Sequence, residues 1–184
     1  MSRWRKDFAG FLVVLLTAIS SHGLVHAATS KDPSVGLLVS QTYTSPDRAI
    51  SADVVIASPT DCESKVTIHD HQRTLLEVSY LSADHDHGQC VVVAKWSRDS
   101  RFFVYSMANA GGHQAWHDYI MIYSRENGEL LSLDHYVADP ITSFQFRLFG
   151  DHSIEFETTT VPWSDHVPPR KVRVDMTTLN VQEP

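Results

Sequence analysis

Histidine is the residue type in this sequence with the widest range of possible chemistry, because an imidazole binds metal ions and transfers protons near neutral pH. Eleven of the 184 residues are His, and many lie beside carboxylates. The candidate metal ligands lie in three short segments: His69 and His71, His85 and His87, and His113 and His117. The first pair has a spacing that points both rings to one side of an extended backbone, as a zinc or copper site requires.

None of these spacings matches an established ligand motif. His113 and His117 lack the Glu and the helical pattern of a metalloprotease motif. The competing interpretation is that these are solvated loop histidines, because turn positions usually face water. A metal titration separates the two hypotheses, since a specific site should raise the free energy of unfolding by about 2.7 kcal/mol at a hundredfold excess of zinc or copper over the dissociation constant.

Catalysis has little support in the sequence. There is no Gly-x-Ser-x-Gly motif for a nucleophile, and the pair Gly111-Gly112 is not followed by the helical pattern of a phosphate-binding loop. The nearby carboxylates of Asp84 and Asp86 fall in a turn, where solvation is the ordinary explanation. We therefore expect no catalytic residues, no enzyme activity and no cofactor other than the zinc or copper considered above.

Two long loops are better suited to binding than to catalysis. They span residues 108–118 and 158–170, and their candidate contact residues are His113, Gln114, Trp116, His117, Trp163, Asp165 and His166. Long loops with aromatic side chains on a rigid β scaffold commonly carry recognition. The alternative is that Trp116 and Trp163 fold back and cap the open ends of the sheets.

Short strands must position these loops. The apolar residues come in short runs that are rich in Val, Ile, Phe and Tyr and are separated by turn residues, which predicts an all-β chain. The clearest element is a hairpin in which residues 90–96 and 102–107 pair across the turn 97–100. Alternation places Val91 with Val93 on one face of the first strand. Both faces of this hairpin are apolar, so we expect a cover on each side and therefore stacked sheets.

The runs also repeat along the chain. Residues 64–70 and 74–76 resemble residues 118–124 and 129–131, and residues 171–176 form a decayed third copy. Likewise, residues 96–104 have a counterpart in residues 148–156. Self-similarity at a period of about fifty residues is typical of propeller blades. We expect repeat units at about 60–107 and 118–158, with the decayed copy at 171–181.

One stretch of about 40 residues resembles a blade of the WD-repeat-like β-propellers. The resemblance rests on Trp96-Ser97-x-Asp99-Ser100-Arg101-x-Phe103-Val104-Tyr105-Ser106, then Tyr119 to Tyr123, then Asn127 to Leu131. Such blades occur in the periplasmic propeller of the Tol system and in prolyl-oligopeptidase-type peptidases. The family usually has Pro where this chain has Arg98 and Gly where it has Ser100.

The resemblance implies antiparallel four-stranded meanders of propeller-blade type. A closed propeller typically needs four to eight blades, and about 157 residues supply at most three, so we expect two or three units stacked as an open sandwich. The peptidases perform their chemistry in a separate hydrolase domain, and none of their catalytic residues is carried over. By analogy with propeller blades, the expected partner is a protein.

The N-terminus predicts export. Basic residues precede an apolar run from Phe8 to Ile19, and Ala27 is a small residue of the kind that signal peptidase prefers. We expect a signal peptide over residues 1–27 and one all-β domain over residues 28–184, in the periplasm or outside the cell. No later segment is long and apolar enough to cross a membrane.

Export also predicts a disulfide and reduces the range of expected partners. An oxidising compartment lets Cys62 and Cys90 pair, which the chain-entropy model values at roughly 3 to 4 kcal/mol. Cleavage would remove three positive charges and one negative charge and take the formal charge from −7 to −9. An acidic chain repels phosphate backbones, so nucleic acid is not an expected partner.

Overall fold

A computed structural model describes residues 40–57, 62–84, 87–109, 117–160 and 167–179. These residues form three antiparallel sheets. The first sheet contains β1 (Gln41–Thr44), β2 (Ser51–Ile56), β3 (Ser64–His69) and β4 (Thr74–Ser79). The second contains β5 (Gln89–Trp96), β6 (Phe102–Asn109), β7 (Tyr119–Ser124) and β8 (Glu129–Ser132). The third contains β9 (Arg147–Phe149), β10 (Ser153–Thr158) and β11 (Arg170–Asp175).

Two 3-10 turns, η2 (Leu133–Tyr136) and η3 (Met176–Thr178), follow β8 and β11. In each sheet, strands that are consecutive in sequence are hydrogen-bonded neighbours, so each sheet is a meander. The prediction of an all-β chain built from antiparallel meanders is confirmed. No helix among the described residues is long and apolar enough to cross a bilayer.

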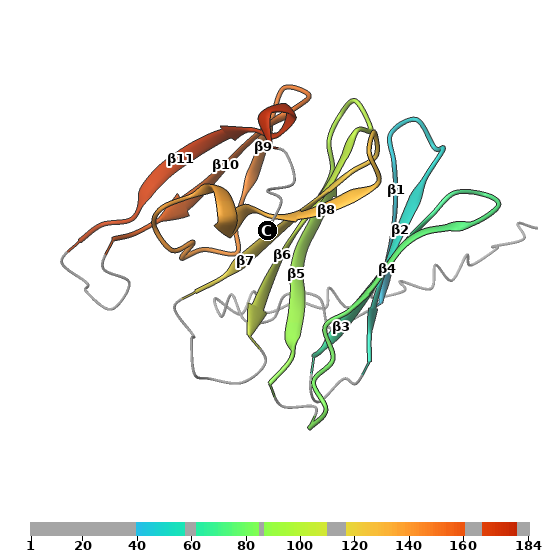
Figure 1. Ribbon diagram of the computed structural model, residues 1–184, viewed down its shortest axis with the longest axis horizontal. Coiled ribbons are helices and arrows are strands. Elements are labelled where there is room, and N and C mark those ends of the chain that lie inside the picture. Colours follow the sequence, from blue (N-terminus) through green and yellow to red (C-terminus); the bar gives the residue numbers. More distant parts are fainter. Residues whose placement is uncertain (1–39, 58–61, 85–86, 110–116, 161–166, 180–184) are drawn as a thin grey trace, which may run out of the picture. The chain divides into compact units, whose positions relative to one another are not determined.

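The second sheet lies between the other two (Figure 1). Alternate residues of its strand β6 enter different cores. Phe102 and Val104 pack with residues of the third sheet, among them Ile154. Phe103 and Tyr105 pack with residues of the first sheet instead. The apolar faces of the hairpin β5–β6 are thus covered on both sides, as the sequence predicted.

One detail of the hairpin differs from the prediction. The sequence placed Val91 and Val93 on the same face of β5, but Val91 packs in the core with the first sheet and Val93 packs against the other core. The pairing register with β6 shifts between these two residues. A β-bulge inserts one extra residue and so reverses the alternation, which local patterning does not reveal.

The sequence similarities fall on equivalent strands. The segments that resemble one another are β3–β4 and β7–β8, which are the third and fourth strands of their sheets. Similarly, the counterparts β5–β6 and β9–β10 are the first and second strands of theirs. The sheets themselves span residues 41–79, 89–132 and 147–175.

The first two sheets are joined by a disulfide and by polar contacts. The predicted bond between Cys62 and Cys90 is present and connects the segment before β3 to β5. Trp96 of β5 donates its indole N–H to the carbonyl oxygen of Tyr43 at 2.8 Å. These links cross between sheets that are not hydrogen-bonded edge to edge, so they fix how the two sheets stack.

Candidate functional site

The four short turns of the first two sheets gather at one end, which we call the turn end: residues 45–50, 70–73, 97–101 and 125–128. A direct contact confirms that the turns meet, because the backbone N–H of Asp47 donates to the hydroxyl of Ser100 at 3.0 Å. The loops predicted to bind a partner follow the C-terminal ends of β6 and β10, away from the turn end.

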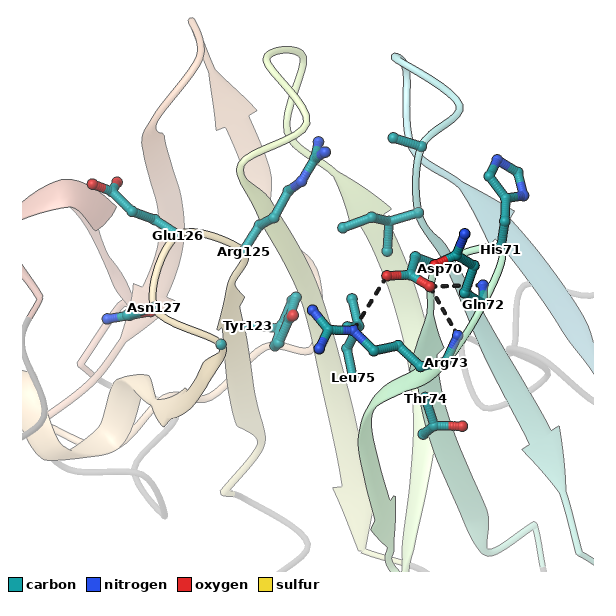
Figure 2. A pocket seen from close by; sticks show the side chains of 13 residues that line it. Asp70, His71, Gln72, Arg73, Thr74, Leu75, Tyr123, Arg125, Glu126 and Asn127 are labelled. Carbon is teal, nitrogen blue, oxygen red and sulfur yellow. Dashed lines mark hydrogen bonds and ion pairs between the residues drawn. The ribbon is translucent and has the colours of Figure 1, made fainter.

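A hollow of about 720 Å³ opens at the turn end between the first and second sheets (Figure 2). Its lining comes from three turns and the strands beside them: Ala49, Ile50, Asp70, His71, Gln72, Arg73, Thr74, Leu75, Tyr123, Arg125, Glu126, Asn127 and Gly128. The hollow therefore combines an apolar floor with a polar and charged rim, which is typical of a binding site.

Tyr123 is the most deeply placed polar residue of this lining. It is only 1% exposed, yet its side chain reaches the hollow. Its hydroxyl has no hydrogen-bond partner among the described residues. Burial raises the pKa of Tyr123, while the charges of Arg125 and Arg73 act against that rise. The phenol is consequently neutral at physiological pH and offers both a donor and an acceptor.

Asp70 shapes one wall of the hollow. Its carboxylate accepts the backbone N–H groups of Gln72 at 2.8 Å and Arg73 at 2.9 Å, and these two bonds lower the pKa of Asp70. The Nε of Arg73 lies 3.5 Å from the same carboxylate. Asp70 is therefore committed to the turn, and most of the Arg73 guanidinium remains available to a ligand.

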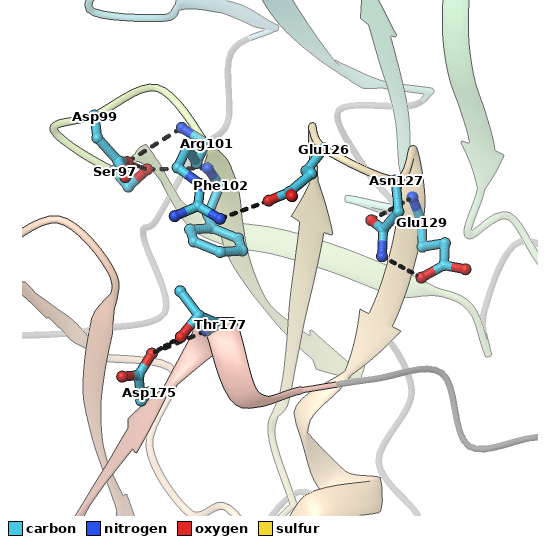
Figure 3. A network of polar contacts seen from close by, with 9 residues as sticks. All are labelled: Ser97, Asp99, Arg101, Phe102, Glu126, Asn127, Glu129, Asp175 and Thr177. Atoms are coloured by element: carbon cyan, nitrogen blue, oxygen red, sulfur yellow. Dashed lines mark hydrogen bonds and ion pairs between the residues drawn. The ribbon is translucent and has the colours of Figure 1, made fainter.

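Ion pairs on both sides hold the opposite wall, the turn 125–128. Arg125 is ion-paired with Asp47 of the β1–β2 turn. Glu126 accepts a hydrogen bond from Arg101 at 2.6 Å (Figure 3). Gly128 has a φ of 72°, a left-handed conformation that suits glycine. The walls of the hollow are thus formed before any ligand arrives.

The opposite end of the sheets carries a second group of ionisable residues. His117 Nε2 lies 2.6 Å from Asp134 Oδ1, and both side chains are largely buried. Asp134 also accepts a hydrogen bond from the hydroxyl of Ser132 at 3.1 Å. The ring of Tyr119 lies 4.5 Å from the imidazole, centroid to centroid. His117 is therefore held in a defined position at the start of β7.

The two loops predicted to bind a partner leave the sheets beside one segment. The backbone N–H of Asp118 donates to the carbonyl oxygen of Ile141 at 3.0 Å, and that of Thr159 donates to the carbonyl oxygen of Pro140 at 3.2 Å. Asp118 ends the first loop, and Thr159 lies at the start of the second. Burial raises the pKa of Asp118 to about 6, although the neighbouring His117 and a backbone N–H from Phe144 oppose the rise.

The other predicted histidines that the structure describes have different neighbours. His69 Nε2 lies 3.0 Å from Asp53 Oδ2, and His87 Nδ1 lies 2.5 Å from Asp84 Oδ2. His71 lines the hollow at the turn end. In the part of the chain that is described, no group of three His, Cys, Asp or Glu residues could hold a metal ion. The zinc or copper hypothesis stays a prediction.

Several predicted site residues lie outside the described residues: His85, His113, Gln114, Trp116, Trp163, Asp165 and His166. Conversely, sequence reasoning missed Tyr123, Arg73 and Arg125. Tyr123 reads as one more apolar strand residue, and the two arginines read as turn residues. Their common site depends on how two sheets stack, so no local signal could have found it.

No protein-family model matches the chain, and no curated protein matches it. Among solved structures, the chain is similar to a crystal structure of a puromycin hydrolase mutant complexed with PGG. The two are 13% identical with a TM-score of 0.32, and the match covers 76% of this chain and 27% of that one. The chain thus spans about a quarter of the length of that protein, and a similarity this low carries no argument about function.

Proposed function

We propose that the chain is an exported, non-enzymatic binding module whose partner is a protein, and that the hollow at the turn end is its contact surface. The observation that carries the proposal is the hydroxyl of the buried Tyr123, which faces the hollow without a hydrogen-bond partner among the described residues. The hydroxyl is open to the hollow, so a ligand that bonds to it gains one hydrogen bond, which is worth about 0.5 to 1.5 kcal/mol.

The composition of the hollow favours a protein as the partner. Tyr and Arg are the residue types most enriched at the centres of protein interfaces, and here Tyr123 lies beside Arg73 and Arg125. The charges of the lining balance, because Asp70 and Glu126 oppose the two arginines. A protein segment with both polar and apolar side chains matches such a surface better than a strongly charged ligand does.

Rigidity supports the same proposal. The ion pairs of Arg125 with Asp47 and of Glu126 with Arg101 hold the walls in place, so binding orders little of the surface. The disulfide between Cys62 and Cys90 supports export, because such bonds persist in oxidising compartments. The loops with Trp116 and Trp163 remain a predicted second contact region at the opposite end.

The test begins with affinity capture from extracts of the source cells and their medium, using the wild-type chain and the variant Tyr123→Phe. This substitution keeps the ring and removes only the hydroxyl. We expect a partner protein to bind about tenfold more weakly to the variant, because one hydrogen bond to a buried group is lost. Arg73→Ala should weaken the same partner, because it removes the exposed guanidinium at the rim.

A matched control is Val55→Ala, since Val55 is an exposed apolar residue that does not line the hollow. The control should keep wild-type affinity, and urea unfolding should show that all variants remain folded. Equal binding of the partner to Tyr123→Phe, Arg73→Ala and the wild type would place the contact surface elsewhere. Failure of the wild type to enrich any protein over Tyr123→Phe would contradict the proposal.

A further inference from the structure

Most basic side chains in the described residues have a carboxylate partner. The paired ones are Lys65, Arg73, Arg101, Arg125, Arg170 and Arg173. The basic residues without an ion pair, within the same part of the chain, are Arg48, Lys95, Arg98, Arg147 and Lys171. Three of these, Lys95, Arg98 and Arg147, line one hollow. We call it the basic hollow.

The basic hollow has a volume of about 550 Å³ and lies where the second sheet meets the third. Lys95 belongs to β5, Arg98 to the β5–β6 turn and Arg147 to β9, so three separate elements supply the charges. The remaining lining residues are Trp96, Leu148, Phe149 and Gly150. No carboxylate lies among the lining residues. A neighbouring hollow of about 420 Å³ shares Lys95 and Arg147 and adds Lys171, together with Glu155 and Glu157.

This arrangement is unfavourable without a ligand. Like charges that face one space repel each other, and the chain has 22 acidic residues against 15 basic ones, so carboxylates are plentiful. A bound anion removes the repulsion. Two guanidinium groups donate forked hydrogen bonds that match the oxygens of a phosphate or sulfate, and a lysine adds a point charge.

Aromatic side chains complete the basic hollow. The ring of Trp96 is fixed because its N–H is already bonded to the backbone of Tyr43. The guanidinium of Arg173 lies over the ring of Phe149, 4.1 Å from the ring centroid, and Arg173 is itself paired with Glu155. These contacts hold both rings in place, and both residues contribute to the lining of the basic hollow.

We propose that the basic hollow binds a small organic phosphate or sulfate ester, with the oxyanion on Lys95, Arg98 and Arg147 and the organic part against Trp96 and Phe149. The volume suits one ester with a ring-sized body rather than a long polymer. This site uses none of the residues of the turn-end hollow, so it is independent of the protein contact proposed above.

Phenyl phosphate and phenyl sulfate are suitable probes, with phenol and inorganic phosphate for comparison. We expect both esters to shift the NMR signals of the Trp96 indole and of residues 147–150 saturably, and phenol to have no effect. Phenyl phosphate should bind more tightly above its second pKa of about 6 than below it, because it then carries two charges. Added salt should weaken the binding of both esters.

The variant Arg98→Gln/Arg147→Gln should reduce the affinity for both esters by at least about tenfold, since it removes two charge-assisted contacts. The matched control is Arg48→Gln, because Arg48 is also exposed and unpaired but lies outside the basic hollow. This control and Tyr123→Phe should bind the esters as the wild type does.

Several results would overturn the inference. Absence of a saturable shift at Trp96, or equal affinity of the wild type and Arg98→Gln/Arg147→Gln, would show that the cations do not form a site. Equal affinity for phenyl phosphate and inorganic phosphate would show that the rings take no part. Binding of a sulfated polysaccharide without binding of either small ester would replace the proposed ligand by a polymer.

Discussion

At the scale of single residues, the local surroundings lower the pKa of two aspartates and raise that of a third. Asp47 and Asp70 lie at the surface and accept hydrogen bonds, led by Ser45 for Asp47 and by the backbone of Gln72 for Asp70, so their pKa values lie below the usual one. Asp118 is partly buried, and desolvation raises its pKa to about 6. Desolvation penalises the charged carboxylate, whereas donated hydrogen bonds favour it.

The first prediction concerns Asp118. Its pKa in the folded chain, about 6, lies above the ordinary value of 3.8, so its negative charge destabilises the fold above that range. Asp118→Asn should therefore be more stable than the wild type near neutral pH, by on the order of 2 kcal/mol once solvent screening of this partly exposed group is allowed for. The advantage should shrink as the pH falls from about 6 to about 4. Urea unfolding of both proteins across this range measures the difference.

Asp70→Asn is the matched control because the shift has the opposite sign. A lowered pKa stabilises the fold above the unfolded value and loses this effect as the pH falls, so Asp70→Asn should be less stable than the wild type near neutral pH. The stability difference between Asp118→Asn and the wild type should change between about pH 4 and about pH 6. A difference that stayed constant from about pH 4 to about pH 7 would contradict a raised pKa.

The second prediction concerns Gly88, in the connection between β4 and β5. A Cβ atom at this position would lie 2.3 Å from Glu63 Oε1 and 2.3 Å from the carbonyl oxygen of Tyr80. The backbone N–H of Gly88 also donates to Glu63 at 2.7 Å. Gly88→Ala should lower the free energy of unfolding by about 2 to 4 kcal/mol, because a buried hydrogen-bond network must open. Chemical unfolding provides the measurement.

Gly128→Asn serves as its control. Gly128 has a left-handed backbone, a Cβ atom added there would have no other atom within 4 Å, and Asn tolerates that conformation. We expect a loss below about 1 kcal/mol for this variant. Equal stability of Gly88→Ala and the wild type would mean that the Glu63 network rearranges without cost.

At the scale of elements, the disulfide links the first two sheets, which are not paired with each other by strand hydrogen bonds. It closes a loop with a sequence separation of 28 residues. The third prediction is that Cys62→Ala/Cys90→Ala folds but loses roughly 3 kcal/mol of stability, because the unfolded chain regains the entropy of that loop. The measurement is urea unfolding of the variant and of the wild type without reductant.

Reductant gives an internal check on this prediction. It should lower the stability of the wild type toward that of the double variant and leave the variant unchanged, since only the wild type has a bond to reduce. Equal stability of the two proteins without reductant would show that the contacts of Trp96 and Tyr43 suffice to hold the sheets together.

The fourth prediction concerns the two long loops. If Trp116 and Trp163 bind a partner, then Trp116→Ala/Trp163→Ala should change the free energy of unfolding by less than about 1 kcal/mol, because exposed side chains contribute little to the fold. If they cap the sheets, the loss should exceed about 3 kcal/mol, as for a buried tryptophan. We expect the smaller value, and thermal and urea unfolding distinguish the two.

At the scale of the whole molecule, one sheet serves two cores. Phe102 and Phe103 are adjacent in β6 and face the third and the first sheet, respectively. The fifth prediction is that Phe102→Ala and Phe103→Ala each cost about 3 to 5 kcal/mol, since both side chains are buried. Each should couple only to substitutions in its own core, because side chains that share no partners contribute independently.

Double-mutant cycles with Ile154→Val test that independence. Ile154 lies in the core with Phe102, so this pair should show a coupling of at least about 0.5 kcal/mol. The pair of Ile154→Val with Phe103→Ala should be additive within about 0.5 kcal/mol. Strong coupling of Phe103 to Ile154 would mean that the three sheets share one packing unit.

Sequence patterns were enough to predict the all-β class, the hairpin 90–107 with its two apolar faces, and the cysteine pair, although β1 was not among the predicted runs. These features depend on alternation, on turn residues and on the redox compartment, all of which are local or compositional properties. Even here, the bulge between Val91 and Val93 escaped prediction, because it depends on how β5 pairs with β6.

The two candidate sites, by contrast, emerged from the three-dimensional packing. The ion pair between Arg125 and Asp47 joins residues 78 positions apart, and the basic hollow joins β5 to β9. Such contacts arise when meanders that are far apart in sequence stack face to face. The apolar faces that drive the stacking are visible in the sequence, but the polar residues brought together at its edges are a consequence of the packing.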